Sequence, residues 1–256
     1  MALRGERFLA SAVGAVGGQR FRGRIERQAA RYWSAPEEKA WEANSHWRNG
    51  IGDDAWLEVG RDHWKMYEQF SRALRVPGPG TVLEWGTGGG ANAVAFAPHA
   101  QRFIAADIAQ DSLDECLRQV RSTCATPIEA RLIDLDCPEK TVVGLENSCD
   151  VFLCLYVIEV TTGVDAVRAI LDIAKSVLVP GGMALVQMKY HTSEGRRGRP
   201  GIAYARNLAL TTTFTIEEFW KLAADCGLIP QLITLVPENR LDRNYAYFAL
   251  TTPIGE

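Results

Sequence analysis

The sequence lacks the features that mark membrane proteins and disulfide-stabilised proteins. No apolar run approaches the roughly 20 residues that a membrane-spanning helix needs, so no membrane span is expected. The six cysteines form no C-x-x-C pair, which argues against a zinc knuckle or a disulfide framework. Reduced thiols in a cytoplasmic protein are therefore the expectation.

An excess of charge is also missing. The formal net charge is −3, and acids and bases are mixed along most of the chain, so no nucleic-acid partner is expected. Only the start of the chain is unusual, since residues 1–18 are ordered like a secretory signal, with basic residues before an apolar run. Glu6 interrupts the basic part and an arginine-rich stretch follows at 20–31, which favours a basic amphipathic helix instead. The sequence leaves open whether the protein is a monomer or a homodimer.

A change of pattern divides the chain near residue 76. Residues 35–74 are helical in character and rich in aromatic residues, and they end at the run VPGPG, residues 76–80. We predict an N-terminal helical cap or lid over residues 1–75 and a second, catalytic domain over residues 76–256.

Beyond this boundary, apolar runs alternate with amphipathic segments. Strand-like runs occur at 81–85, 102–108, 129–135, 149–158, 183–190, 231–237 and 244–250. Helix-like segments lie at 91–97, 111–122, 164–178 and 215–228, the last with Thr215 and Glu218 as a capping box. This alternation predicts an α/β fold, a mostly parallel sheet with helices on both faces that ends in a closing strand pair.

A glycine-rich stretch, EWGTGGG at 84–90, directly follows the first predicted strand. Such a turn lets backbone N–H groups approach a nucleotide-like ligand at the carboxyl edge of the sheet. Gly86, Gly88 and Ala91 satisfy G-x-G-x-x-A, with Asp107 at the end of the second strand, so a nicotinamide dehydrogenase stays an alternative. Glu84 argues against a pyrophosphate, because it adds negative charge beside the site, and favours a ligand with positive charge.

With this acid, the stretch resembles the first motif of the class I S-adenosylmethionine-dependent methyltransferases. Further similar stretches lie at 103–113, 130–139, 148–161 and 178–190. The resemblance covers roughly residues 80–252 and implies a Rossmann-like, seven-stranded sheet with an antiparallel last strand. It departs from the family at Glu159–Val160, where many members carry a histidine after the acid.

The resemblance implies S-adenosyl-L-methionine as cofactor and a set of residues that bind it. Asp107 is implied for the ribose hydroxyls and Asp134 for the adenine amino group. The implied cofactor-binding residues are Glu84, Gly86, Thr87, Gly88, Gly90, Asp107, Ile108, Asp134, Leu135 and Leu155.

Three histidines are candidates for a general base. His191 leads because it follows the fifth strand at the edge that carries the site, while His63 and His46 lie in the aromatic segment expected to cover the cofactor. Asp134, Asp136 and Asp150 could suggest magnesium, but Asp134 is already assigned to adenine, and no metal is expected.

The sequence thus predicts methyl transfer to a small-molecule acceptor, most readily at a hydroxyl of a sugar or a secondary-metabolite scaffold. Methylation of nitrogen or of a carboxyl group is an alternative. A cofactor-binding domain without transfer activity, such as a cyclase or a regulatory subunit, is another.

Overall fold

Seven strands form one sheet in this protein, and helices connect most of them along the chain. The structure is a computed structural model, which describes residues 25–33, 40–191, 208, 211–238 and 243–254. The strands are β1 (Thr81–Trp85), β2 (Arg102–Asp107), β3 (Ile128–Leu132), β4 (Cys149–Cys154), β5 (Leu178–Lys189), β6 (Ile229–Glu238) and β7 (Arg243–Thr251).

The helices flank these strands and precede them. After a helical stretch at 25–33, the α-helices are α2 (Ala40–Asn44), α3 (Arg48–Ile51), α4 (Asp53–Leu74), α5 (Ala91–Phe96), α6 (Gln110–Thr123), α7 (Val164–Val177) and α8 (Ile216–Asp225). Short 3-10 turns are η1 (Ala97–His99), η2 (Pro138–Val142) and η3 (Ile158–Val160). The predicted capping box opens α8, where Thr215 Oγ1 accepts a hydrogen bond from the backbone N–H of Glu218.

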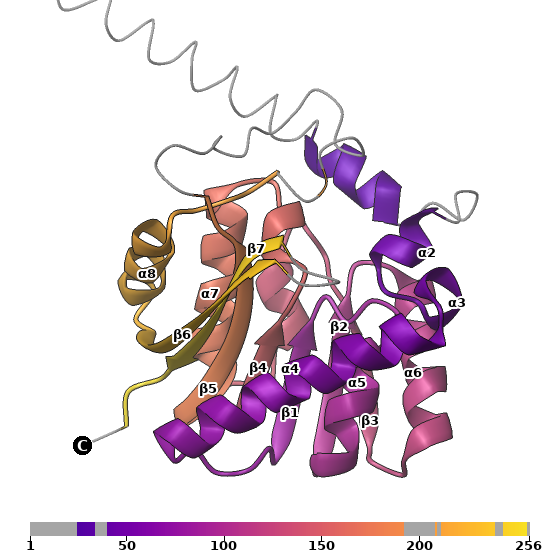
Figure 1. Cartoon of the computed structure of the whole chain (residues 1–256), viewed down its shortest axis with the longest axis horizontal. Coiled ribbons are helices and arrows are strands. Elements are labelled where there is room, and N and C mark those ends of the chain that lie inside the picture. Colours follow the sequence, from indigo (N-terminus) through magenta and orange to yellow (C-terminus); the bar gives the residue numbers. More distant parts are fainter. Residues whose placement is uncertain (1–24, 34–39, 192–207, 209–210, 239–242, 255–256) are drawn as a thin grey trace, which may run out of the picture.

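The sheet order is β3-β2-β1-β4-β5-β7-β6 (Figure 1). The first five strands are parallel, while β7 runs antiparallel to both β5 and β6. The predicted fold class, a mostly parallel Rossmann-like sheet with an antiparallel last strand, is confirmed. The order reverses direction between β1 and β4, and the carboxyl edge at such a switch point is where sheets of this type bind ligands.

Two apolar clusters cover the two faces of the sheet. Val82 of β1 packs with α5 and α6 residues, including Phe96 and Leu113, whereas its neighbour Leu83 packs on the opposite face with Leu171 of α7. Successive residues of a strand point to opposite faces, so each buried strand supplies both clusters. The rigid sheet between these layers fixes where the loops at its carboxyl edge emerge.

Helix α4 belongs to the same packing, although it lies within the predicted cap. Its Tyr67 and Phe70 are buried in the cluster that contains Val82. At Gly60 the helix comes so close to α5 that an added Cβ would lie 2.2 Å from the carbonyl oxygen of Ala91. The predicted boundary after residue 75 therefore follows a helix that is packed on the sheet.

None of the helices in the described ranges combines the length and apolar character required to span a membrane.

Candidate active site

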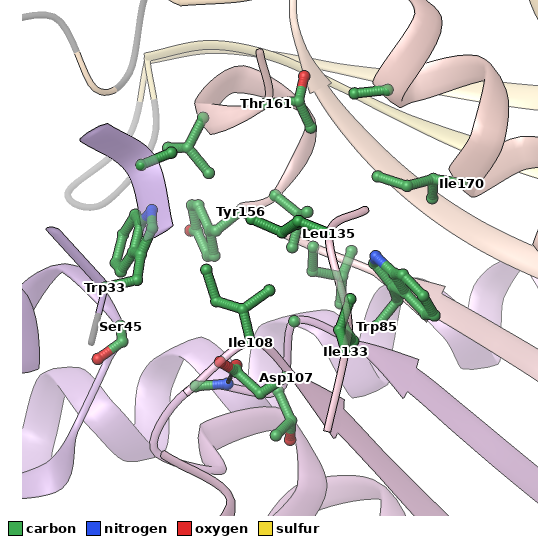
Figure 2. A pocket seen from close by; sticks show the side chains of 18 of the residues that line it. Trp33, Ser45, Trp85, Asp107, Ile108, Ile133, Leu135, Tyr156, Thr161 and Ile170 are labelled. Atoms are coloured by element: carbon green, nitrogen blue, oxygen red, sulfur yellow. Dashed lines mark hydrogen bonds between the residues drawn. The ribbon is translucent and has the colours of Figure 1, made fainter. Parts of the chain in front are cut away.

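A cavity of about 350 Å³ opens at the carboxyl ends of β1, β2 and β4. Figure 2 shows Asp107 and Ile108 on one side of this space and Trp33, Ser45 and Tyr156 on another. Asp107 is the last residue of β2 and Ile108 follows it, whereas Trp33 and Ser45 belong to the N-terminal part of the chain. We call the described residues 25–33 and 40–51 the cap segment. The cavity therefore lies between the sheet edge and the cap segment.

The glycine-rich loop passes between the cap segment and the turn after β4. Gly86 and Gly88 both have positive φ values, 77° and 50°, which favour glycine. An added Cβ at Gly86 would lie 2.4 Å from Cγ2 of Val157, and one at Gly88 would lie 2.2 Å from the carbonyl oxygen of Ser45. The same carbonyl accepts a hydrogen bond from Gly89 N at 2.8 Å. The loop thus needs glycine to pack against its own protein, as well as to admit a ligand.

Asp107 organises the end of β2 and lines the cavity. Its Oδ2 accepts a hydrogen bond from Gly88 N at 2.8 Å, and its Oδ1 accepts one from Ala109 N at 2.9 Å. Burial raises the pKa of the carboxyl, while these backbone donors lower it. A carboxylate has about four acceptor positions, so this one can still accept hydrogen bonds from a ligand's hydroxyl groups.

Glu84 lies behind the cavity wall. It is fully buried on β1, and its two oxygens accept hydrogen bonds from Thr87 Oγ1 at 2.8 Å and Asn92 Nδ2 at 2.9 Å. Burial raises the pKa of Glu84 to about 8, although both hydrogen bonds lower it. Thr87 and Asn92 line the cavity, so Glu84 acts on the site through them and, once ionised, through its charge.

The structure brings most of the other predicted cofactor residues to the same space. The residues of this group that line the cavity are Gly86, Thr87, Gly88, Asp107, Ile108, Leu135 and Leu155. Gly90 is instead the N-cap residue of α5, and Asp134 Oδ1 accepts a hydrogen bond from Asp136 N at 2.9 Å. Neither Gly90 nor Asp134 is among the lining residues in the described part of the chain.

The three candidate histidines lie in different environments. His46 lines the cavity and its ring stacks on Tyr156, with centroids 4.5 Å apart. His63 is buried on α4, with Nδ1 2.7 Å from Asn92 Oδ1 and Nε2 3.0 Å from Tyr247 Oη. His191 follows β5; its Nδ1 is buried without a hydrogen-bond partner in the described ranges, and it does not line the cavity there. Of the three, only His46 lines the cavity.

Tyr156 and Asn92 are two of the cavity residues that the sequence prediction missed. Tyr156 lines the cavity directly after β4 with a positive φ of 58°. Asn92 lies in the first turn of α5 and connects Glu84 to His63. Tyr156 lies near the carboxyl end of the predicted strand 149–158, and Asn92 comes just after the glycine loop, so nearness to the carboxyl edge of the sheet could have identified both. Val160, which stands where a histidine was expected from the resemblance, also lines the cavity.

Within the described residues, no group of three or more His, Cys, Asp or Glu side chains could hold a metal ion.

Comparison with known proteins adds a family match. Residues 82–182 match the family model of a methyltransferase domain. A search of curated proteins finds no match.

Several solved structures share the fold. The N-methyltransferase NodS from Bradyrhizobium japonicum WM9 has a TM-score of 0.55 at 15% identity, over 78% of this chain and 98% of NodS. A structure of NodS in complex with S-adenosyl-L-homocysteine has a TM-score of 0.53 at 14% identity, over 75% and 87% of the two chains. The [4+2]-cyclase SpnF has a TM-score of 0.57 at 14% identity, over 75% of this chain and 81% of SpnF. At these identities the likeness is one of fold alone.

Proposed function

We propose that this protein, whose residues 82–182 are a class I, S-adenosylmethionine-dependent methyltransferase domain, methylates a hydroxyl group of a small-molecule acceptor. The predicted class and cofactor are confirmed by the domain match; the acceptor is our proposal. One observation carries it. A single cavity is lined both by the glycine loop with Asp107 and by His46 and Tyr156, so it offers a cofactor wall and an acceptor wall together.

The residues of the first wall suit the cofactor. The Asp107 carboxylate would accept hydrogen bonds from ribose hydroxyls, and the apolar side chains of Ile108, Ile133 and Leu135 would contact a flat ring. Glu84, once ionised, would favour a cationic ligand near Thr87 and Asn92. When bound, S-adenosylmethionine supplies an electrophilic methyl group.

The second wall would position and activate the acceptor. Because His46 alone of the three candidate histidines lines the cavity in the described ranges, we place the base at its imidazole, and not at His191, which the sequence favoured. A neutral imidazole can take the proton of an acceptor hydroxyl near neutral pH. Tyr156 and Trp33 supply apolar ring surfaces (Figure 2).

The position of the cap segment favours an acceptor of small size. Residues from the helical stretch 25–33 and from the turn at 44–46 close one side of the cavity, which restricts the space to a ligand of modest size. We propose that the covering role predicted for residues 1–75 rests on the part before α4, since α4 packs on the sheet. The cytoplasmic location stays a prediction from the cysteine pattern.

A second candidate is a cofactor-binding protein without transfer activity. It is favoured by Val160, which occupies the cavity wall where a histidine was expected, and the fold is shared with a cyclase. The two functions differ in one product, since only the transferase converts its cofactor to S-adenosylhomocysteine in step with acceptor methylation.

The test is methyl transfer from ¹³C-methyl-labelled S-adenosylmethionine to a metabolite extract, read by NMR and by S-adenosylhomocysteine formation. We expect a labelled product and calorimetric binding of S-adenosylhomocysteine. Asp107→Asn should weaken that binding by about 10- to 100-fold, because charge-assisted hydrogen bonds are lost. Asp111→Asn, at an exposed carboxylate on α6, is the matched control. Binding without labelled product in any extract would favour the second candidate, and no binding would refute both.

A further inference from the structure

A buried chain of hydrogen bonds connects the first strand to the cavity residue Tyr156. We call it the Glu84–Tyr156 chain, and its members are Glu84, Asn92, His63, Tyr247, Gln187 and Tyr156. They come from six different segments: β1, α5, α4, β7, β5 and the turn after β4. Apart from Tyr156, these residues are at most 6% exposed. The chain therefore runs through the interior, from the glycine loop to the acceptor wall.

The first half of the chain has a fixed direction. Asn92 turns its amide nitrogen to Glu84 Oε1, at 2.9 Å, and this bond suits both forms of the carboxyl, because the proton of the neutral form can lie on Oε2, which faces Thr87 Oγ1. The Oδ1 of Asn92 then faces His63 and must accept a hydrogen bond from its Nδ1–H, at 2.7 Å. In the neutral ring this leaves Nε2 as an acceptor, 3.0 Å from the hydroxyl of Tyr247.

The second half continues from this hydroxyl to the backbone. Tyr247 donates to His63 and accepts a hydrogen bond from Gln187 Nε2 at 2.7 Å. The remaining amide oxygen, Oε1 of Gln187, accepts the backbone N–H of Tyr156 at 2.7 Å. Each buried group so far has its partner. Removal of one member would take a hydrogen bond from each of its neighbours, which is costly in a buried site.

The backbone at the end of the chain is strained. Tyr156 has a φ of 58°, a left-handed conformation that is unfavourable for a residue other than glycine. Such a conformation persists where the surroundings hold it, and here Gln187 holds the N–H. This conformation sets the direction of the tyrosine ring, which lines the cavity.

The ring of Tyr156 also leads back to the glycine loop. It stacks on His46, and the preceding residue, Ser45, accepts a hydrogen bond from Gly89 N. The glycine loop is thus tied to the acceptor wall in two ways, through the interior by the Glu84–Tyr156 chain and across the cavity by the cap segment. Both ends of the stacked pair are held relative to the loop that would bind the cofactor.

We propose that Tyr247 is a positioning residue for methyl transfer. Through Gln187 it holds the rings of Tyr156 and His46 in a fixed position relative to the glycine loop. The inference rests on the proposed function. In-line transfer depends on placement, and an error of about 1 Å can cost about 10²-fold in rate. Loss of the Tyr247 hydroxyl should therefore impair turnover and leave the cofactor wall intact.

The test compares Tyr247→Phe with Tyr67→Phe. Both tyrosines are 2% exposed and share one apolar cluster, but the Tyr67 hydroxyl has no hydrogen-bond partner in the described part of the chain. Tyr67→Phe thus controls for the removal of a buried hydroxyl from the same core. Hydrogen exchange at the Tyr156 amide is measured with S-adenosylhomocysteine as the bound probe. It shows whether the Glu84–Tyr156 chain is intact, and the acceptor is not needed.

In Tyr247→Phe we expect exchange at Tyr156 to rise at least about tenfold while the affinity for S-adenosylhomocysteine stays within about threefold. Turnover in the labelled-methyl assay should fall at least about tenfold with little change in acceptor KM. Tyr67→Phe should change none of these. Wild-type exchange and turnover in Tyr247→Phe, or equal losses in Tyr67→Phe, would overturn the proposal. Failure of the proposed function differs, because the wild type itself would then form no labelled product.

Discussion

The imidazole of His46 stacks on the ring of Tyr156, and both residues have positive φ values, 53° and 58°. Left-handed backbone costs each residue about 1–2 kcal/mol. Strain of this kind gathers at functional sites, and here two strained residues from segments far apart in the sequence meet in the wall of one cavity. The contact is the basis for the first prediction.

His46→Asn should lower kcat for methyl transfer by about 10²–10⁴-fold, because it removes a positioned base. Asparagine tolerates the left-handed backbone, so the turn should survive. The measurement is steady-state methyl transfer, with calorimetry to show that S-adenosylhomocysteine still binds. His99→Asn is the control, since that ring stacks on Trp64 outside the cavity lining. Normal turnover in His46→Asn would leave acceptor activation to another group or to positioning alone.

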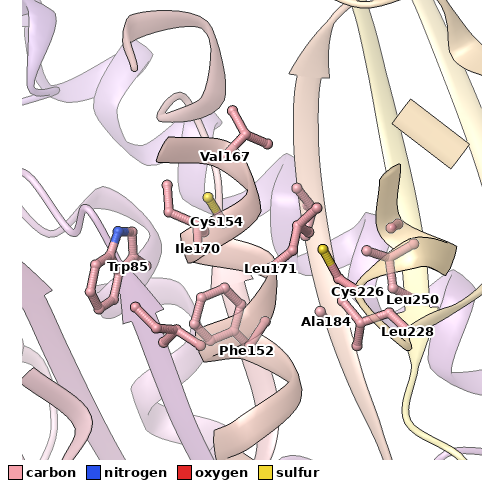
Figure 3. Packing of buried hydrophobic residues seen from close by; sticks show 14 of the residues in the cluster. Trp85, Phe152, Cys154, Val167, Ile170, Leu171, Ala184, Cys226, Leu228 and Leu250 are labelled. Atoms are coloured by element: carbon pink, nitrogen blue, oxygen red, sulfur yellow. The ribbon is translucent and has the colours of Figure 1, made fainter. Parts of the chain in front are cut away.

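The second prediction concerns the core beneath the site. Leu171 of α7 is fully buried in the cluster that also holds Phe152 and Cys154 (Figure 3). Leu171→Ala should lower the free energy of unfolding by about 2–5 kcal/mol, since it removes buried methyl groups and leaves a cavity. Denaturant titration measures the loss. Leu132→Ala, at a 55% exposed leucine on β3, should lie within about 0.5 kcal/mol of wild type. Equal effects at both positions would mean that α7 is not packed as described.

Much of the fold follows from the sequence because its signals are local. The apolar strands, the capping box at Thr215 and the glycine turn after β1 each depend on neighbouring residues. Asp107 follows from the same logic, as the acid at the end of the second strand. These features need no knowledge of how distant segments meet.

The residues of the acceptor wall could not be predicted from such local signals. Whether His46 or His63 reaches the cavity depends on how the cap segment and α4 pack on the sheet, and no local pattern encodes that packing. Histidine chemistry alone would make all three candidate histidines equivalent. Gly88 shows the same limit, since its closest neighbour is Ser45 of the cap segment, which the glycine motif does not reveal.

The third prediction follows from the pKa of Glu84, which burial raises to about 8 from an ordinary value of 4.5. The folded protein without cofactor then keeps a proton that the unfolded chain releases. Stability from this group is fully present below pH 4.5 and is lost as the pH rises to about 8. The free energy of unfolding, from urea titrations at pH 5 and pH 8.5, should therefore fall over this interval.

Glu84→Gln should flatten this pH dependence, because the amide cannot ionise. Part of the slope should stay, since burial also raises the pKa of the nearby Asp107 carboxyl. The thiols of Cys116 and Cys154, which also feel the charge of Glu84, have pKa values raised by burial and so stay protonated in this range. An unchanged slope in Glu84→Gln would place the pH dependence elsewhere.

The last prediction separates two costs at Gly88. Its φ of 50° strains any other residue, and an added Cβ would also lie 2.2 Å from the carbonyl oxygen of Ser45. Gly144 has a positive φ of 81° but no atom within 4 Å of an added Cβ, so Gly144→Ala measures the backbone strain alone. That strain is about 1–2 kcal/mol in the free energy of unfolding.

In Gly88→Ala the collision of the added Cβ with the Ser45 carbonyl adds to this strain, and either Ser45 or the glycine loop must move. We expect Gly88→Ala to weaken S-adenosylhomocysteine binding at least tenfold, about 1.4 kcal/mol, and Gly144→Ala to leave binding unchanged. Calorimetry of both variants decides the matter, because equal affinities would show that Ser45 can yield without disturbing the cofactor wall.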